Sequence, residues 1–389
     1  MIRAVAIALV AASTAVVLSC EDDSGSAASA GGAGASTGGG STSSGGFGGG
    51  GTTPVGGSDA GGSDPTGGSH AGGAGGAGGS VSPLHAVVVT FNTGTTDGMD
   101  HDAGPGDVYT EDDVQTSDQH YGNGLSWLPA VEATRQFFAT LQPDVVAFQE
   151  IFHAEDCAII PAQYHPGFYC ETWSPGGPTV AQYVLGAGYQ VACHLGKPDK
   201  CIGVRSGFGS IQGCSGDLCL DGLAGAQVQD CGSGSRIGRG VIDLAAGGTV
   251  TVVSVHGTSG ILPADQGCRV QQIDQVFVDL GDGSSQPAAS GVRSVVLGDF
   301  NTDPGRHTAF DVSAQRWNFF VGGSQAFHWI SPIGSSAPPT YANLFNIDHV
   351  VSDGYEGTCW AAGVTPGHPD VYPPAYFDHK PLVCDVDVP

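Results

Sequence analysis

Basic residues and long apolar runs are scarce in this chain. Only 12 of its 389 residues are Lys or Arg, against 38 Asp or Glu, and the formal net charge is −26 at pH 7. This balance excludes a protein that grips nucleic acid through basic stripes. Beyond the extreme N-terminus no run of about 18 apolar residues occurs, so the bulk of the chain is not expected to span a membrane. Charged residues make up 13% of the chain while Gly contributes 65 residues, which predicts a low-complexity segment.

The first twenty residues are typical of an export signal. Arg3 precedes the apolar stretch 4–18, which is too short for a comfortable transmembrane helix. The stretch ends in Ser19-Cys20 and resembles the lipobox of bacterial lipoproteins, in which the Cys becomes the acylated first residue. The resemblance implies a signal peptide over 1–20 and a lipid on Cys20, which would anchor the exported chain to a membrane facing the periplasm or the cell exterior. The alternative is ordinary signal cleavage and a secreted chain.

Two regions of different composition follow. Residues 21–83 contain 25 Gly, five acidic residues and no Lys or Arg, so they are expected to remain a disordered linker. Residues 84–389 suit one large domain. They retain 33 of the 38 acidic residues and 11 of the 12 basic ones, a net charge of −22.

The domain has the pattern of an α/β fold, in which strands and helices interleave. A helix is expected over 126–141, capped by Ser126, and a second one is indicated by the spacing of Val270, Ile273, Phe277 and Leu280. Apolar, β-branched runs predict strands at 85–90, 144–148, 189–194, 250–256, 292–297, 347–352 and 381–386.

Ten Cys remain once Cys20 is set aside as the lipid attachment point. An even number in an exported chain predicts five disulfides rather than zinc sites. Cys359 and Cys384 lie outside the cluster of the other eight and are expected to pair. The remaining pairings stay open.

Polar residues that can carry chemistry stand at the ends of the predicted strands or beside them. Open α/β sheets place their sites outside strand ends, so these residues are expected to converge. Carboxylate and amide oxygens without thiolates are the ligands that Mg²⁺, Ca²⁺ or Mn²⁺ prefer. The segments are Thr90-Phe91-Asn92, Phe148-Gln149-Glu150, Ser254-Val255-His256, Leu297-Gly298-Asp299-Phe300-Asn301, Ile347-Asp348-His349 and Asp378-His379-Lys380-Pro381.

In these six segments and their order, the chain resembles the endonuclease/exonuclease/phosphatase superfamily. These metal-dependent phosphoesterases include DNase I-like nucleases, abasic-site endonucleases, inositol polyphosphate phosphatases and neutral sphingomyelinases. The resemblance extends over residues 87–386. It implies a DNase I-like four-layer α/β/β/α sandwich, in which two mixed β-sheets are flanked by helices. It also implies Mg²⁺ as cofactor, with Ca²⁺ or Mn²⁺ as alternatives.

The resemblance implies a metal site and its ligands. Glu150 is expected to be the principal metal carboxylate, with Asn92 and Asp378 nearby. Asp299 and Asn301 would both face the cleft, where they hold the metal or the attacking water and orient the phosphoryl oxygens. For Asn92 alone, capping a turn is the structural alternative.

The resemblance also implies an acid–base apparatus. His379 would be the general base, with Asp348 fixing its tautomer. His256 would donate a hydrogen bond to a phosphoryl oxygen or protonate the leaving oxygen. The alternatives are a satisfied core histidine at His256 and a turn initiator at Asp348. His349 is expected to point away from the site.

Two departures from the DNase I-like pattern put duplex DNA in doubt as the substrate. Such nucleases place an Arg just after the motif Glu, whereas Ile151-Phe152 follows Glu150 and resembles the corresponding stretch of secreted sphingomyelinases. They also pair the equivalent of His256 with a Glu, and Lys200 stands near the expected position of that Glu.

Two further features have no assigned role. The acidic segment 95–121 is long for a loop; a solvated insertion is favoured, with a Ca²⁺ site or a lid over the cleft as alternatives. Arg236 and Arg239 approach the strand that precedes His256, where either phosphate binding or a surface role fits.

The sequence therefore predicts an extracytoplasmic, divalent-metal-dependent phosphodiesterase, a nuclease that cleaves phosphodiester bonds by in-line attack of water. The alternatives are a phospholipase C-like sphingomyelinase or other phosphoesterase and, in a different class, a catalytically silent surface binding module. The expected partners are a phosphoester substrate, either nucleic acid or a phospholipid headgroup, and a membrane through the lipid anchor only. No protein partner is inferred, and a monomer is expected.

Overall fold

The computed structural model describes residues 85–95, 109–220, 227–232, 236–371 and 376–387. The expected signal peptide 1–20, its Cys20 and the linker 21–83 lie outside these residues. Among the described helices, none combines the length and the apolar character needed to cross a bilayer.

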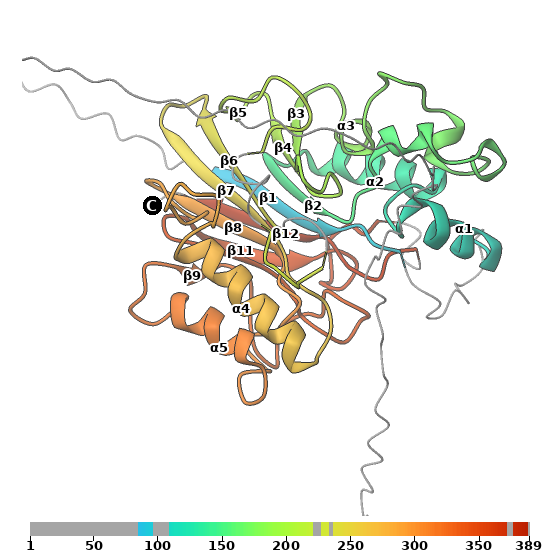
Figure 1. Cartoon of the computed structure of the whole chain (residues 1–389). Coiled ribbons are helices and arrows are strands. Elements are labelled where there is room, and N and C mark those ends of the chain that lie inside the picture. Colours follow the sequence, from blue (N-terminus) through green and yellow to red (C-terminus); the bar gives the residue numbers. More distant parts are fainter. Residues whose placement is uncertain (1–84, 96–108, 221–226, 233–235, 372–375, 388–389) are drawn as a thin grey trace, which may run out of the picture. The chain divides into compact units, whose positions relative to one another are not determined.

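Two six-stranded sheets form the centre of the domain (Figure 1). The first contains, in spatial order, β11 (Glu356–Ala361), β12 (Leu382–Asp387), β1 (His85–Asn92), β2 (Val145–Gln149), β4 (Cys201–Arg205) and β3 (Tyr189–Cys193). The second contains β5 (Gly209–Ile211), β6 (Ile237–Leu244), β7 (Thr249–His256), β8 (Ser294–Asp299), β10 (Asp348–Ser352) and β9 (His328–Trp329). Both sheets are mixed, because β1–β2 and β7–β8 pair in parallel and the other neighbours are antiparallel.

Helices flank the two sheets on their outer faces. The α-helices are α1 (Glu111–Tyr121), α2 (Leu128–Leu141), α3 (Val180–Leu185), α4 (Pro263–Phe277) and α5 (Val312–Phe320), and short 3-10 helices lie at Ala154–Ala158, Ala162–Tyr164 and Tyr169–Glu171. In Figure 1, α4 and α5 lie beside the second sheet, and α1 to α3 lie on the side of the first.

Alternation along the strands explains this layering. In β1, Val89 and Phe91 pack with α2 residues such as Phe138 in an outer core, while Val88 faces the inner core between the sheets. A third core joins the second sheet to α4 and α5. Three apolar layers between four structural layers confirm the α/β/β/α sandwich predicted from the sequence.

All seven predicted strands form, each within two residues of its expected ends. The expected cap at Ser126 is wrong: α2 begins at Leu128, and Trp127 precedes it without a side-chain capping bond. Ser126 is buried, and its carbonyl accepts a hydrogen bond from the Tyr169 amide, so it serves a neighbouring turn instead. Leu280 lies beyond the end of α4 but is still buried in the core.

The acidic segment is not simply a solvated loop, because residues 111–121 form α1. Thr110 caps this helix and forms a capping box with Asp113. Only Ser117 and Tyr121 of α1 are buried, so most of its polar residues remain toward solvent. Residues 96–108 of the segment lie outside the described part of the chain.

The ten cysteines form five disulfides, as predicted, and Cys359 is paired with Cys384 across β11 and β12. The other bridges are Cys157–Cys170, Cys193–Cys201, Cys214–Cys219 and Cys231–Cys268.

Candidate active site

The parallel strand pairs bring the polar motifs together. Asn92 lies beside Gln149 at the ends of β1 and β2, and His256 lies beside Asp299 at the ends of β7 and β8. A buried chain of hydrogen bonds joins the two sheets here, since Gln149 accepts from the Thr90 hydroxyl at 3.1 Å and donates to the Ser254 hydroxyl at 3.1 Å. The carboxyl ends of four central strands therefore form one site.

Two site residues adopt the left-handed backbone region. Glu150 directly after β2 has φ 55°, and Asn301 after β8 has φ 50°. Such conformations are uncommon for residues other than Gly and gather at functional sites, where the surrounding fold holds them. The turns let each chain leave its strand abruptly while the side chain stays in the cleft.

Asp299 occupies the centre of the site and is fully buried. Its Oδ2 accepts hydrogen bonds from the amides of Asn92 at 3.1 Å and Asn301 at 2.9 Å. The Nε2 atoms of His379 and His256 lie 3.7 Å and 3.8 Å from the same oxygen. Residues from both sheets therefore surround one carboxylate.

Glu150 lies next to this centre and leaves no room for a side chain at Gly94. Its Oε1 is 3.1 Å from His256 Nε2 and 3.2 Å from Asn92 Nδ2. A Cβ added at Gly94 would meet Glu150 Oε2 at 2.4 Å. The side-chain Oδ1 of Asn92 accepts from the Gly94 amide at 3.0 Å, so Asn92 turns its Nδ2, and not its Oδ1, toward the carboxylates.

His379 is held from one side by Asp348. Its Nδ1 lies 2.8 Å from Asp348 Oδ2, and both residues are buried. The Tyr341 ring packs against the imidazole with a centroid distance of 4.7 Å. A ring with Nδ1–H donated to a carboxylate presents Nε2 to the cleft, which is the arrangement of an oriented general base.

The site carries more negative charge than its own cations balance. Burial would lower the pKa of His379, but the charges of Asp348, Asp378 and Asp299 outweigh burial and raise it well above its usual value. Burial and the charge of Asp348 raise the pKa of Asp299 to about 7. The pKa of Asp299 is raised even though a positively charged His379 lies beside it. The carboxylates of the site therefore carry more negative charge than this one imidazolium can balance.

In the neighbouring pair, Glu150 and His256, the pKa shifts have the opposite sign: the carboxyl pKa is lowered and the imidazole pKa is lowered as well. Burial raises the pKa of Glu150, but the hydrogen bond from His256 and the charges of both imidazoles outweigh it and lower the pKa. Burial lowers the pKa of His256 to about 4 despite Glu150. At neutral pH the pair is therefore an ionised carboxylate and a neutral imidazole that donates through Nε2.

This donor set fits a divalent cation. Ligand atoms of Asp299, Asp348 and His379 all lie within 4.8 Å of one another. The Oδ1 atom of Asp348 is buried and has no protein partner within the described structure. Hard oxygen donors, surplus negative charge and an unsatisfied carboxylate oxygen are what Mg²⁺, Ca²⁺ or Mn²⁺ would satisfy.

An open cleft of about 1140 Å³ lies over this centre. Glu150, His256, Asp299, Asn301, Asp378 and His379 line it. Residues of α1, including Asp112 and Asp118, line it as well, so this helix of the acidic segment borders the site. Within the described part of that segment, no set of three acidic or imidazole side chains lies close enough to hold a cation.

The structure thus gathers all the residues singled out from the motifs. Asp378 lies at the cleft wall beside His379, and its metal role remains a prediction. His349 lies beside the Ser331 hydroxyl at 3.3 Å and contacts the Phe300 ring, so it points away from the cleft as expected.

Sequence reasoning missed several contributors. Lys200 was the wrong position at which to look for a partner of His256, because the carboxylates near that histidine belong to Glu150 and Asp199. The role of Gln149 as a bridge between sheets depends on a partner 105 residues away, and no local pattern marks it. Gly94, two residues after Asn92 at the end of β1, is the one sequence feature that indicates a close approach of another side chain, which the structure shows to be Glu150.

No protein-family model and no curated protein matches the sequence. The chain is similar to several solved structures. The chain is similar to ANGEL2, described as a 2',3'-cyclic phosphatase, with TM-score 0.47 and 12% identity over 79% of this chain and 96% of that one. It is similar to the human Nocturnin catalytic domain with bound sulfate, with TM-score 0.45 and 13% identity over 79% and 95%. It is also similar to D. rerio TDP2 complexed with single strand DNA product, with TM-score 0.45 and 11% identity over 78% and 98%. At identities this low, the likeness is not evidence of a shared activity.

Proposed function

We propose that this chain is an exported, divalent-metal-dependent phosphodiesterase that acts as a nuclease. The observation that carries the proposal is the buried carboxylate of Asp299, shared by two asparagine amides and approached by two histidines at the open end of both sheets. We also propose that the chain belongs to the endonuclease/exonuclease/phosphatase superfamily, because the six sequence motifs occur in the order typical of that family.

The residues divide the work of hydrolysis by position. In its neutral form, which a bound cation would favour by offsetting the surrounding carboxylates, His379 Nε2 takes a proton from the attacking water, while Asp348 holds Nδ1–H and stabilises the imidazolium that results. The water oxygen forms a bond to phosphorus while the ester bond opposite it breaks, and the leaving oxygen takes a proton from solvent in the open cleft. Neutral His256 would donate its single N–H to a phosphoryl oxygen in exchange for Glu150, which supports its role as a donor over that of a proton source. The Asn301 side-chain amide donates to Asp299 and to the Gly257 carbonyl, so it orients the carboxylate.

A cation held by Glu150, Asp299 and Asp378 would supply stabilisation of the negative charge that develops on the phosphoryl oxygens. The asparagines then orient these carboxylates. In the conformation described, Asn92 does so through its nitrogen, so its own place as a ligand stays a prediction.

A phospholipase C-like sphingomyelinase is the second candidate, and one observation favours it. Ile261 and Phe310 line the cleft, and both are strongly exposed, which suits an apolar substrate or interface. The residues after the motif Glu do not decide between the candidates, because Ile151 and Phe152 are buried in the core and cannot touch a substrate.

A substrate panel tests these alternatives. The purified domain is incubated with plasmid DNA, single-stranded DNA and sphingomyelin vesicles in millimolar Mg²⁺, Ca²⁺ or Mn²⁺, with and without EDTA. If DNA is cleaved and EDTA abolishes that cleavage, the nuclease is supported. If only sphingomyelin is cleaved, the sphingomyelinase is supported. Turnover of nothing, together with calorimetric Mn²⁺ binding, would support a silent binding module and contradict the proposal.

The exported location is a separate proposal, supported by the lipobox-like sequence and by the five disulfides, which persist in oxidising compartments. Expression of the full chain in a bacterium and replacement of Cys20→Ser test the anchor. We expect the unchanged chain in the membrane fraction and the variant released or left unprocessed. Equal partition of both forms would contradict lipid attachment.

A further inference from the structure

One wall of the cleft carries a concentration of positive charge that the catalytic centre does not use. Lys197 and Arg236 line the cleft, and Lys200, in the same turn as Lys197, is fully buried. Lys197 and Lys200 both lie within ion-pair distance of Asp199, and burial lowers the pKa of Lys200 to about 8. In a domain with a net charge of −22, such a grouping requires an explanation.

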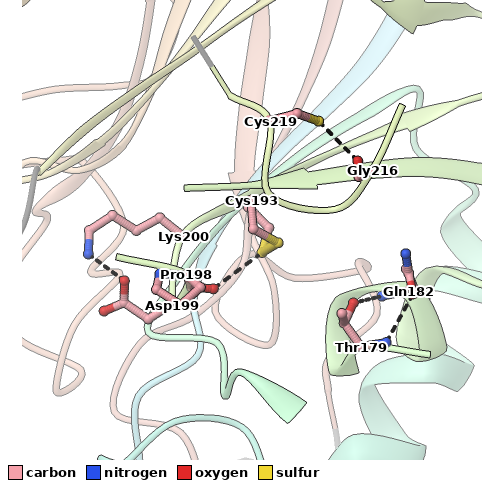
Figure 2. The surroundings of a disulfide bond; sticks show 9 residues. Thr179, Gln182, Cys193, Pro198, Asp199, Lys200, Gly216 and Cys219 are labelled. Atoms are coloured by element: carbon pink, nitrogen blue, oxygen red, sulfur yellow. Dashed lines mark hydrogen bonds and ion pairs between the residues drawn. A yellow bond between two sulfur atoms is a disulfide. The ribbon is translucent and has the colours of Figure 1, made fainter. Parts of the chain in front are cut away.

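The turn between β3 and β4 holds the two lysines in place. The Cys193–Cys201 disulfide closes this turn at its base, and the Ile151 amide donates to the Asp199 carbonyl at 2.9 Å. Figure 2 shows the Lys200 side chain extending to Asp199, whose Oδ1 lies 2.7 Å from Nζ. Lys197 Nζ is 3.8 Å from the other oxygen of the same carboxylate.

Arg236 is held by its backbone, and its side-chain Nε has no partner in the described structure. Its carbonyl accepts from the His256 amide at 2.9 Å, so it lies directly beside the catalytic strand end. The residue is 92% buried. Arg269 in the same cleft shows the contrast, because its guanidinium donates to two carbonyls, the Ser313 hydroxyl and Asp311.

The charge balance of this wall points to an anionic ligand. Lys197 and Lys200 share the single carboxylate of Asp199, which leaves one positive charge of this pair unbalanced, and Arg236 adds another at the same cleft. A buried guanidinium Nε–H without a partner in the described structure is costly, and a phosphate group satisfies it with a charge-assisted hydrogen bond. The lysine and arginine side chains reach the cleft next to His256, adjacent to the position proposed for the scissile phosphate.

We propose that Lys197 and Arg236 form a subsite for a second phosphate group of the substrate, next to the phosphodiester that is cleaved. Lys200 supports it from behind by pairing with Asp199. This inference rests on the proposed function and deepens it: the substrate is a chain with consecutive phosphates, and a phosphocholine headgroup with its single phosphate does not fill the subsite.

Short oligonucleotides test the subsite. KM is measured for the dinucleotide TpT and for its 5'- and 3'-phosphorylated forms, pTpT and TpTp, under the divalent cation that supports turnover. We expect one phosphorylated form to have a KM roughly tenfold below that of TpT, about the contribution of one charge-assisted hydrogen bond. In Arg236→Gln and Lys197→Gln, the ratio between the two KM values should fall toward one.

The controls separate the subsite from the catalytic function. Arg135→Gln removes a half-buried arginine of α2 that pairs with Glu132 and does not line the cleft, and it should leave the KM ratio at the wild-type value. Lys197 is less buried than Arg236, so Lys197→Gln still tests the KM ratio if Arg236→Gln fails to fold. Hydrolysis of all three substrates with equal KM in the wild-type protein would overturn the subsite alone. Hydrolysis of none, with DNA also left intact, would overturn the proposed function.

Discussion

The imidazole of His379 is the single side chain on which the proposed chemistry depends most. It contacts Asp348 through one nitrogen and faces Asp299 through the other, so its orientation is fixed from both sides. Among the described residues, one oxygen of Asp348 has no partner. The ring is therefore held in one orientation, and its Nε2 points to the place where water and phosphate would meet.

Replacement of His379 by Ala should lower kcat by roughly 10²- to 10⁴-fold, because a positioned general base contributes about that much. The measurement is steady-state hydrolysis of the substrate found in the panel. His368→Ala is the matched control: His368 stacks on Trp360 outside the cleft, and its loss should leave kcat unchanged. An unaltered kcat in His379→Ala would exclude the role of general base.

Gly94 allows a sharper test of the carboxylate cluster. In Gly94→Ala the added Cβ would occupy a position 2.4 Å from Glu150 Oε2 and push that carboxylate away, although the backbone itself tolerates Ala. We expect Mn²⁺ affinity, measured by calorimetry, to fall roughly tenfold, the lower end of what the loss of a well-oriented ligand environment costs.

Gly188→Ala is the control for that substitution, because nothing lies within 4 Å of its added Cβ. It should bind Mn²⁺ as the wild-type protein does. Wild-type affinity in both variants would show that Glu150 does not contribute to a cation site.

At the scale of elements, the two sheets are joined by polar contacts as well as by the apolar core. His194, just after β3 of the first sheet, is fully buried, and its Nε2 lies 2.7 Å from the carbonyl of Ile237 in β6 of the second. Burial and the charge of Lys200 lower the pKa of His194 to about 3. The ring is neutral in the folded protein at every pH at which enzymes commonly work.

Folding stability should therefore fall in mild acid. Below the unfolded-state pKa of about 6.5, the unfolded chain takes up a proton on His194 that the folded chain cannot accept until about pH 3. Each pH unit in this window costs about 1.4 kcal/mol. In His194→Gln, which retains a donor for Ile237, the denaturant-derived stability should decline less steeply between pH 6.5 and 4, whereas parallel curves would contradict this role.

Element by element, local pattern explains what was predictable. The seven predicted strands are apolar runs whose burial is dictated by composition. Strand β11 escaped prediction because Glu356, Gly357 and Thr358 are exposed, and its pairing with β12 supplies what its composition lacks. Helix α1 escaped because its stability comes from a capping box and few buried residues, in a segment that reads as acidic and solvated.

The candidate site was predictable residue by residue only where a motif adjoins a predicted strand. The amide orientation of Asn92, the link from Gln149 to Ser254 and the Nε of Arg236, which has no partner among the described residues, all depend on packing between distant segments. Asp199 lines the cleft, whereas its neighbour Lys200 does not. This difference depends on where the pairing of β3 with β4 begins, at Cys201, and the sequence does not mark that position.

At the scale of the whole molecule, the acidic surface opposes the approach of a long polyanion. At about 10 mM ionic strength this repulsion reaches roughly 30 Å, and at physiological salt only about 8 Å. We therefore expect KM for plasmid DNA to fall as NaCl rises from about 10 to 150 mM, the reverse of the trend for basic nucleases. KM measured at constant divalent cation concentration checks this, and a KM that rises steadily with salt would contradict it.

The pairing of β1 with β12 places His85 opposite Asp387, at the far end of the strand that finishes in Asn92. An eight-residue strand rises about 3.3 Å per residue, so the backbone enters the domain roughly 25 Å from the reactive carboxylates. The polypeptide leading into His85 thus joins at one pole while the mouth of the cleft opens at the other. An attachment made through His85 would therefore lie at the opposite end of β1 from the reactive carboxylates.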